Sequence, residues 1–336
     1  MNVRAAGGWL DRLSPPSAVL EIPTMAHPTL EDVAARAGVS RALVSLVMRG
    51  SPKVGKERRE AVLKAADELG YRPNVMARGL AAGRTGMAGV LAADLHDPLF
   101  ATLHDGLAEE AGRRGVRLLL VGGDGRPARE RAALGELLDL RLDGLLLAGP
   151  RIAAAEIERA AAGTPVTVAG RSLRSARVDC VTGDDAAAVK LAVEHLAGLG
   201  HRRVTCMDLG RSRLEKAFRA AVDEAGLTAV QDVPWRSPGA PTAVLALGDM
   251  TGTAALTALY RAGLDVPGDV SLIVHGDAPG AAETGVTTVG APPRELGRLA
   301  MGALLDRIGD NGTGEGRRIT VPPVLTERAT TRALTP

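Results

Sequence analysis

The sequence lacks residues on which several classes of protein depend. Among 336 residues only Cys180 and Cys206 are cysteines, without a CxxC pair or a Cys/His cluster, so we expect neither a disulfide framework nor a zinc site. This cysteine usage fits a reduced, cytoplasmic compartment. The longest apolar runs, such as residues 144–148, are far too short to span a bilayer, which argues against a membrane protein.

Signatures of catalysis are also missing. The chain contains no glycine-rich dinucleotide fingerprint, no phosphate-binding Walker loop and no His/Asp cluster with metal-ligand spacing. His96 and His104 are eight residues apart, and we interpret them as surface histidines. We therefore predict that the chain is not an enzyme and that it uses neither a cofactor nor a metal.

The N-terminal part of the chain differs from the rest. Residues 1–27 contain Pro15-Pro16 and lack the continuous apolar segment of a signal peptide, so we expect a disordered extension, with Met25 as an alternative to Met1 as the true start. Residues 25–86 hold 11 Lys and Arg against 6 Asp and Glu, whereas residues 87–336 hold 28 against 31. This asymmetry is typical of a polyanion-binding head on a larger body, although a solvated charged helix face would give the same excess.

Residues 28–73 show the pattern of three short helices. In the first, Thr29 and Asp32 have capping-box spacing, and apolar residues follow at i, i+3, i+4 and i+7. Gly38 then breaks the chain, Ser40 can cap a second helix, and a third helix follows. Two short helices separated by a glycine-containing turn are the helix-turn-helix signature of DNA-binding proteins.

This head, together with the segment after it, resembles the LacI/GalR (lactose repressor/galactose repressor) family of bacterial transcription factors. Family-like runs recur over roughly residues 28–330. They are TLEDVAARAGVS (29–40), ELGYRPN (68–74), VEHL (193–196), GHRR (200–203), VPGDVS (266–271) and ELG (295–297).

Beyond residue 85, strands and helices alternate, which predicts parallel sheets covered by helices on both faces. We expect strands at 87–93, 116–121, 142–148, 166–169, 179–182, 203–207, 243–247 and 270–274, and helices at 98–114, 126–141, 153–162, 184–199, 213–225, 251–262 and 293–308. The resemblance implies that residues 86–330 form a two-lobed core, similar to periplasmic sugar-binding proteins, for effector binding and dimerisation. The predicted fold class is α/β, with an all-α head.

One stretch departs from the family pattern. Between Leu227 and Ala243 the family supplies a strand, a helix and a loop. If residues 228–233 form the strand, only residues 234–242 remain, and they contain three prolines. A parallel crossover needs about a dozen residues or more, so we expect the C-terminal lobe to lack one helix.

The resemblance also assigns DNA contacts within the head. The family places its main specificity contacts at the positions of Arg41 and Ala42. Arg41 can give a guanine two hydrogen bonds, worth about 1–3 kcal/mol of discrimination, while Ala42 and Leu46 can contact a thymine methyl group. For Leu46 the alternative is a loosely packed surface leucine. The candidate contacts are Thr29, Ser40 and Ser45 to phosphates, and Arg41, Ala42, Leu46 and Arg49 on the outward face of the second helix.

Residues 74–85 resemble the hinge helix of the family. By resemblance, two such helices of a dimer lie in the minor groove, where Leu80 wedges between base pairs and kinks the duplex. Short isolated helices are marginal in water, and Gly79 costs about another 1 kcal/mol, so we expect the hinge to fold only on DNA. The candidate contacts are Asn74, Ala77, Arg78 and Leu80.

The expected effector site, between the lobes, is the least family-like part. Glycine stands at three positions where the family usually has a polar side chain: Gly170, Gly248 and Gly276. Buried sugar hydroxyls without partners are costly, so we expect an effector other than an ordinary neutral sugar, or none. The remaining candidates are Asp94, Phe100, Arg171, Asp184, Trp235 and Asp249. Structural alternatives are an interlobe ion pair for Arg171, a plain surface or packing role for Trp235 and a helix N-cap for Asp249.

Together these features predict a DNA-binding transcriptional regulator, a repressor, that acts as a homodimer on a pseudo-palindromic operator. A small molecule between the lobes, a sugar or another metabolite, would modulate its affinity, and its location would be the cytoplasm, at the nucleoid. The alternative is a degenerate regulator of the same fold that binds DNA without an effector. A sugar-transport protein would instead have a signal peptide and no head. The sequence shows no leucine-heptad tail, so we do not expect a tetramer formed by that route.

Overall fold

The computed structural model describes residues 28–72, 84–207, 212–231, 233–310 and 312–334. Contacts divide the chain into two compact units, residues 1–78 and 79–336. The extension expected at residues 1–27 and most of the expected hinge lie outside the described residues. The same is true of the candidate contacts Asn74, Ala77, Arg78 and Leu80.

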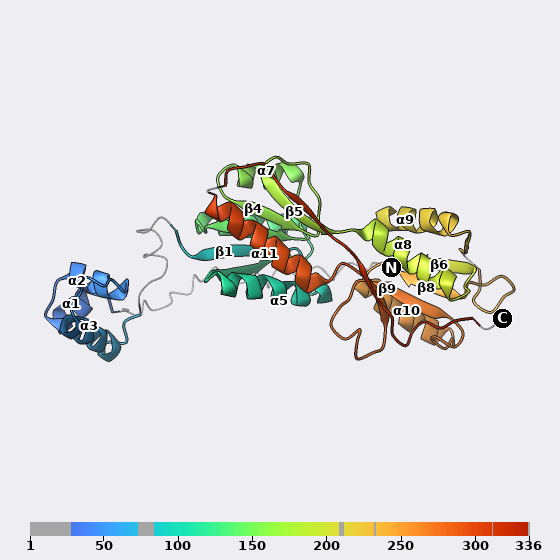
Figure 1. The fold of residues 1–336 in the computed structure, drawn as a ribbon, viewed down its shortest axis with the longest axis horizontal. Helices are drawn as coiled ribbons and strands as arrows, with labels where there is room; N and C mark the ends of the chain where they lie inside the picture. Colours follow the sequence, from blue (N-terminus) through green and yellow to red (C-terminus); the bar gives the residue numbers. More distant parts are fainter. Residues whose placement is uncertain (1–27, 73–83, 208–211, 232, 311, 335–336) are drawn as a thin grey trace, which may run out of the picture. The chain divides into compact units, whose positions relative to one another are not determined.

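The smaller unit contains the three expected helices of the head (Figure 1): α1 (Leu30–Ala37), α2 (Arg41–Met48) and α3 (Lys56–Glu68). Its core is built from small apolar side chains, among them Val33, Val44, Val47 and Val62, all of which are buried. Each helix contributes one apolar face to this core, as the helical spacing of these residues predicts.

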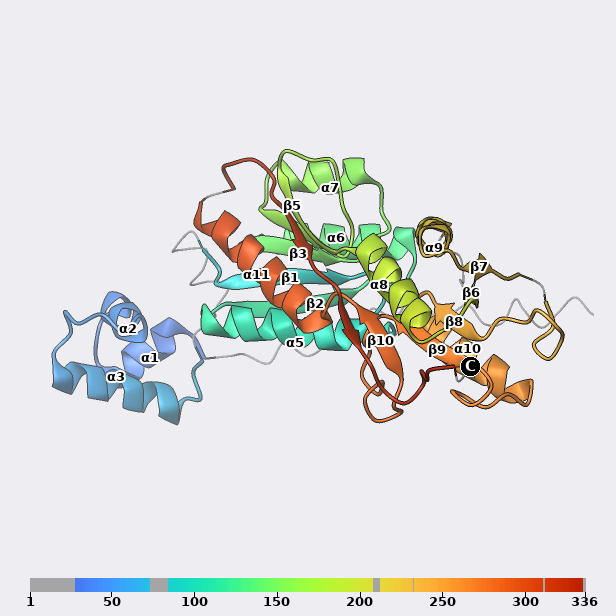
Figure 2. The ribbon, with the colours of Figure 1, turned by 45° about the vertical axis from the view of Figure 1, so that its right-hand side comes forward.

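The first sheet of the larger unit has six strands and is parallel throughout. In spatial order they are β11 (Arg318–Val321), β5 (Val178–Gly183), β4 (Val166–Ala169), β3 (Gly144–Ala148), β1 (Met87–Ala92) and β2 (Arg117–Gly122). Figure 2 shows the helices that cover it. Helices α5 (Pro98–Arg113) and α11 (Pro293–Gly309) pack on one face, and α6 (Pro127–Asp139) and α7 (Ala154–Ala161) pack on the other.

Successive residues of β3 alternate between these two helical layers. Leu146 packs with the cluster of α5 and α11, whereas Leu145 and Leu147 pack with the cluster of α6 and α7. Because both faces of the strand are covered, its sequence is apolar without interruption.

Helices α5 and α11 approach each other so closely that glycine is required at their contact. A Cβ atom on Gly106 would lie 1.9 Å from the carbonyl oxygen of Arg294, and one on Gly297 would lie 2.1 Å from that of Leu103. The two helices therefore pack backbone against backbone, although α11 lies nearly two hundred residues after α5 in the sequence.

The second sheet also has six strands. In spatial order they are β12 (Val324–Thr326), β10 (Thr287–Gly290), β9 (Ser271–His275), β8 (Ala243–Ala246), β6 (Arg203–Met207) and β7 (Thr228–Ala229), and only β12 is antiparallel to its neighbour. Helices α8 (Asp185–Gly198) and α9 (Ser212–Glu224) pack on one face, and α10 (Asp249–Arg261) packs on the other.

The α/β prediction is confirmed, and the strands and helices expected within residues 86–330 are present with ends that agree within two residues, apart from the expected strand 228–233. That strand was predicted too long, since β7 comprises only Thr228–Ala229. Three strands, β10, β11 and β12, were not predicted. They have four, four and three residues, which is too short for a periodic pattern to show.

The expected loss of one helix in the second lobe is confirmed. The described residues between β7 and β8 form turns and extended segments without a helix. In place of a helix, the half-buried Trp235 packs against the core cluster that contains Val244, Leu259 and Leu272. A loop with one large side chain thus covers the sheet face beside α10.

Other features of the described residues bear on the classes of protein excluded above. No helix there combines the length and the apolar character needed to cross a membrane, and no three His, Cys, Asp or Glu side chains are grouped as they would be around a metal ion. The two cysteines lie on strands of different sheets, Cys180 on β5 and Cys206 on β6. Burial raises the pKa of the Cys180 thiol, which keeps it protonated and unreactive.

Candidate DNA-reading surface and effector site

The first helix of the head begins with the predicted capping box. The Thr29 hydroxyl accepts a hydrogen bond from the Asp32 backbone N–H at 3.3 Å, and the Asp32 carboxylate accepts one from the Thr29 backbone N–H at 2.8 Å. The second of these hydrogen bonds holds the pKa of Asp32 below its usual range. Thr29 therefore has a structural role in helix α1 in addition to its predicted phosphate contact.

Helix α2 presents the expected face to solvent at its beginning and end. Ser40 is its N-cap and accepts a hydrogen bond from the Leu43 N–H at 3.3 Å, while Arg41, Ala42 and Arg49 are exposed. An exposed helix N-terminus is the part of a recognition helix that approaches base edges in the major groove.

The middle of α2 differs from the prediction in part. Leu46 was expected to face outward and Ser45 to contact a phosphate, but both are only half-exposed, and Leu46 also packs against the core of the head. The Ser45 backbone carbonyl accepts a hydrogen bond from Arg49 Nε at 3.2 Å. Leu46 thus has part of its surface available for a thymine methyl and part committed to packing.

Arg41 has a partner that the sequence analysis did not identify. Its Nε lies 2.9 Å from Oε1 of Glu31 on the first turn of α1, and both side chains are largely exposed, at 67% and 60%. Opposite charges at the starts of two crossing helices were visible in the sequence, but their contact depends on the angle between the helices.

The N-terminus of α3 is a second basic feature that the sequence analysis did not single out. Its N-cap, Gly55, provides no side-chain hydrogen bond, and Lys56 and Arg58 are exposed on its first turn. Backbone N–H groups without a side-chain cap, beside two cations and the one carboxylate of Glu57, suit a phosphate oxygen. The signal in the sequence was the run KVGKERR (53–59), which contributed there only to the net charge.

In the first sheet, the candidate Asp94 follows β1. Its carboxylate accepts a hydrogen bond from the His96 backbone N–H at 2.9 Å, which holds the pKa of Asp94 below its usual range. Arg151, which the sequence analysis missed, donates to the Gly125 carbonyl at 2.8 Å, and its positive charge also favours the ionised form of Asp94. An exposed cation therefore stands near Asp94 at the carboxyl ends of β1 and β3.

Arg171 has structural partners within its own lobe. One of its guanidinium nitrogens, Nη1, donates to the backbone carbonyls of Pro150 at 3.0 Å and Ile152 at 2.6 Å. These carbonyls belong to the segment between β3 and α7, so the side chain fixes a loop of its own lobe. Among the described residues Arg171 forms no ion pair, so the alternative of an interlobe ion pair is absent there, while its effector contact stays a prediction.

Asp184 and Phe100 also have structural partners. Asp184 is the N-cap of α8, where its carboxylate accepts a hydrogen bond from the Ala187 N–H at 3.0 Å. Phe100 is half-buried on the first turn of α5, and its ring centroid lies 6.1 Å from that of His104. Neither arrangement identifies a ligand.

The two candidates in the second sheet have different outcomes. Trp235 packs against the core, which agrees with the packing alternative. Asp249 is the first residue of α10 rather than its N-cap, which is Gly248 with no side-chain hydrogen bond. The N-cap alternative for Asp249 was therefore wrong.

The three glycines at the expected effector positions have left-handed backbone conformations. The φ angles are +76° at Gly170, +117° at Gly248 and +115° at Gly276. At Gly248, ψ is 153°, a combination that is essentially restricted to glycine and costs other residues about 1–3 kcal/mol. The backbone conformation at these three positions thus favours the glycines that stand there over polar residues.

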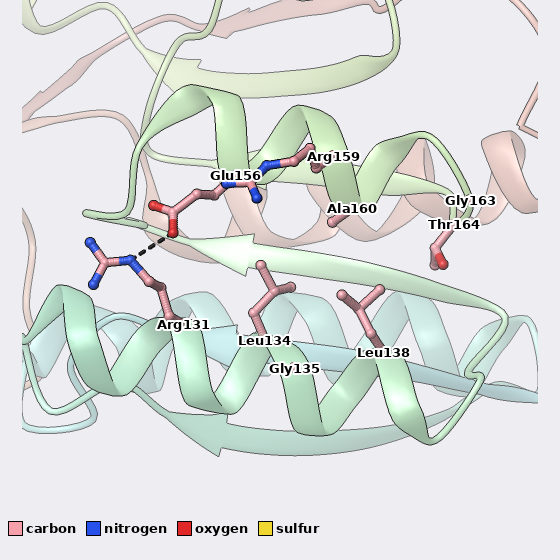
Figure 3. A pocket seen from close by; sticks show the side chains of 9 residues that line it. All are labelled: Arg131, Leu134, Gly135, Leu138, Glu156, Arg159, Ala160, Gly163 and Thr164. Atoms are coloured by element: carbon pink, nitrogen blue, oxygen red, sulfur yellow. Dashed lines mark hydrogen bonds and ion pairs between the residues drawn. The ribbon is translucent and has the colours of Figure 1, made fainter.

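A hollow of about 390 Å³ lies elsewhere, between α6 and α7 on the outer face of the first sheet (Figure 3). Its floor is apolar, with Leu134, Leu138 and Ala160, and an ion pair of 2.6 Å between Arg131 Nε and Glu156 Oε1 lies at one end. None of the predicted effector residues lines it, so it does not locate the expected effector.

Comparison with known proteins matches both parts of the chain. The model for bacterial regulatory proteins of the lacI family matches residues 29–74. A model for periplasmic binding proteins and the sugar binding domain of the LacI family matches residues 85–254, and one for a periplasmic binding protein-like domain matches residues 193–331.

Two transcriptional regulators and one solved structure are similar to the chain over most of its length. The HTH-type transcriptional regulator MalR of Streptomyces coelicolor is 30% identical over 90% of this chain and 97% of its own length. The HTH-type transcriptional repressor CytR of Escherichia coli is 31% identical over 91% of this chain and 97% of its own. The crystal structure of the lac repressor dimer bound to operator and the anti-inducer ONPF has the same fold, with a TM-score of 0.77 at 23% identity over 91% of this chain and 99% of that one. The chain therefore belongs to the LacI family of bacterial regulatory proteins, which confirms the prediction of a DNA-binding regulator rather than an enzyme.

Proposed function

We propose that this protein is a repressor that binds a pseudo-palindromic operator as a homodimer and reads base pairs through the N-terminal half of α2. The observation that carries the proposal is the exposure of Arg41 and Ala42 directly after the Ser40 cap. An arginine in this place can donate two hydrogen bonds to a guanine, and an alanine can contact a thymine methyl. The proposed location is the cytoplasm, at the nucleoid.

The proposed dimer is supported by one edge of the first sheet. The edge strand β2 carries apolar side chains that are incompletely covered, and Leu120 is 38% exposed. An uncovered apolar edge strand favours association, and a two-fold dimer places two heads on a symmetric site. The similar lac repressor structure is that of a dimer on its operator.

Selection from random-sequence duplexes with the full chain tests the proposal. We expect a symmetric site of two half-sites and a steep decrease in affinity with salt concentration. Replacement of Arg41 by Ala should change the preferred base at one position of each half-site. Replacement of Leu120 by Lys should weaken dimerisation in sedimentation experiments. An asymmetric site, or a preference that is unchanged in the Arg41→Ala variant, contradicts the proposal.

The hinge at residues 74–85 remains part of the proposal. By the family resemblance, Asn74, Ala77 and Arg78 contact the minor groove and Leu80 wedges between the central base pairs. Replacement of Leu80 by Ala should weaken binding to every operator that is bent at its centre. If this variant kept full affinity and full bending of the duplex, the proposed insertion of Leu80 between base pairs would be contradicted.

A second candidate function is a regulator of this family that does not respond to an ordinary neutral sugar, or to any small molecule. The left-handed conformations of Gly170, Gly248 and Gly276 favour it, because polar side chains that would bind sugar hydroxyls are replaced by glycine in a compatible backbone. Calorimetric titration with monosaccharides and disaccharides tests this candidate. No heat of binding is expected, and micromolar binding of any of them would contradict it.

A further inference from the structure

We propose that Glu31 is a positioning residue for base recognition by Arg41. This inference rests on the proposed function, in which Arg41 reads the operator. Glu31 lies on the first turn of α1 and Arg41 is the first residue of α2, so their ion pair joins the two helices of the helix-turn-helix. The pair spans the turn that separates these helices.

The nitrogen of Arg41 that lies nearest to Glu31 affects how the arginine can bind a base. The closest approach to Glu31 Oε1 is made by Nε, at 2.9 Å, and not by a terminal nitrogen. An arginine can bind the O6 and N7 atoms of a guanine through its two terminal nitrogens. The Glu31 carboxylate beside Nε therefore restricts the direction in which Nη1 and Nη2 point.

The ion pair affects specificity more than folding. Both side chains are mostly exposed, and exposed pairs contribute little to stability. A long flexible side chain that is ordered before binding, however, loses less entropy in the complex, which corresponds to about a two- to twelvefold gain in affinity. The Glu31 carboxylate also repels DNA phosphates in any sequence. Glu31 thus favours the correct base while it disfavours duplexes in general.

The test measures discrimination rather than affinity alone. The full chain is titrated against the selected operator and against duplexes altered at the base pair whose preference depends on Arg41. Discrimination is the dissociation constant for the altered duplex divided by that for the operator. In the Glu31→Gln variant this ratio should decrease about three- to tenfold, while affinity for an unrelated duplex stays constant or increases. Glu60→Gln is the matched control, because Glu60 is an equally exposed carboxylate of the head (64%) that lies 4.0 Å from a cation, Lys56. Its ratio should remain that of the parent chain.

A double variant separates positioning from direct base contact. In an Arg41→Ala background, Glu31→Gln should leave the ratio unchanged within about twofold, because the side chain to be positioned is absent. An unchanged ratio in the single Glu31→Gln variant overturns the proposal. So does an equal decrease in both backgrounds, which would mean that Glu31 contacts the base itself. If Arg41→Ala has no effect on base preference, the proposed role of Arg41 fails first, and that outcome is distinct from a failure of Glu31 alone.

Discussion

Asp179 on β5 and Arg307 on α11 form a buried ion pair, with 2.7 Å between Oδ1 and Nη2. Asp179 is fully buried and Arg307 is 4% exposed. The other carboxylate oxygen lies 2.9 Å from Arg317, which directly precedes β11. The network joins a strand of the first sheet to a helix and a strand that lie more than a hundred residues later in the sequence.

Loss of this pair should destabilise the larger unit. Replacement of Arg307 by Ala is expected to lower the free energy of unfolding by about 3 kcal/mol, because it leaves a buried carboxylate with one partner fewer. Arg298 on the same helix, whose ion pair with Glu295 is partly exposed, is the control, and its replacement by Ala should cost less than about 1 kcal/mol. Urea unfolding of the full chain measures both values, and equal losses would contradict this account.

Stability should depend on pH through His201. This side chain is fully buried, and its ring nitrogens lie 2.8 Å from the Thr242 hydroxyl and 3.1 Å from the Ser271 hydroxyl. Burial lowers the pKa of His201 from its usual value of 6.5, so the folded protein favours the neutral ring. Its contribution to stability is therefore present above pH 6.5 and is lost as the pH falls through the lower pKa of the folded state.

The free energy of unfolding, measured between pH 7 and pH 5, tests this linkage. The parent chain should lose stability over this range, and His201→Gln should reduce that loss. The same slope in the His201 variant and in the parent would rule out His201 as its source.

The contact between α5 and α11 gives a matched pair of glycine variants. Gly106→Ala should destabilise the protein by about 1–3 kcal/mol, because the new methyl group would lie 1.9 Å from the Arg294 carbonyl oxygen and the helices would have to move apart. A Cβ on Gly112, which belongs to the same helix, would have no neighbouring atom within 4 Å, so Gly112→Ala should stabilise the helix by up to about 1 kcal/mol. Thermal unfolding should show a lower melting temperature for Gly106→Ala and an equal or higher one for Gly112→Ala than for the parent chain.

The predictions that succeeded concerned local features. The capping box of Thr29 and Asp32 and the exposure of Arg41 follow from spacing within one helix, and the strand–helix alternation follows from apolar runs. The three missed strands are short, and β11 pairs with β5, whose register places Ile319 beside Val181. Such a pairing depends on the course of the whole chain and leaves little trace in a four-residue segment.

The sequence predicted which residues belong to the candidate site, but not the groups that their side chains contact. The exposure of Arg41 followed from helix geometry, whereas its ion pair with Glu31 depends on how two helices cross. Similarly, Arg171 was recognised as a cation at the end of a strand, but the carbonyls of Pro150 and Ile152 that it binds belong to a neighbouring loop. The covering of the second sheet by Trp235 also required the three-dimensional course of the chain.

The central claim is that the operator sequence is read through the outward face of α2, and an equilibrium titration tests it most directly. Labelled operator and a scrambled duplex of equal length are titrated with the full chain and with the Arg41→Ala variant at physiological salt. The account predicts that the parent chain binds the operator at least about a thousandfold more tightly than the scrambled duplex, and that the variant loses at least about fivefold of this difference. Equal affinity of the parent chain for both duplexes would contradict the claim.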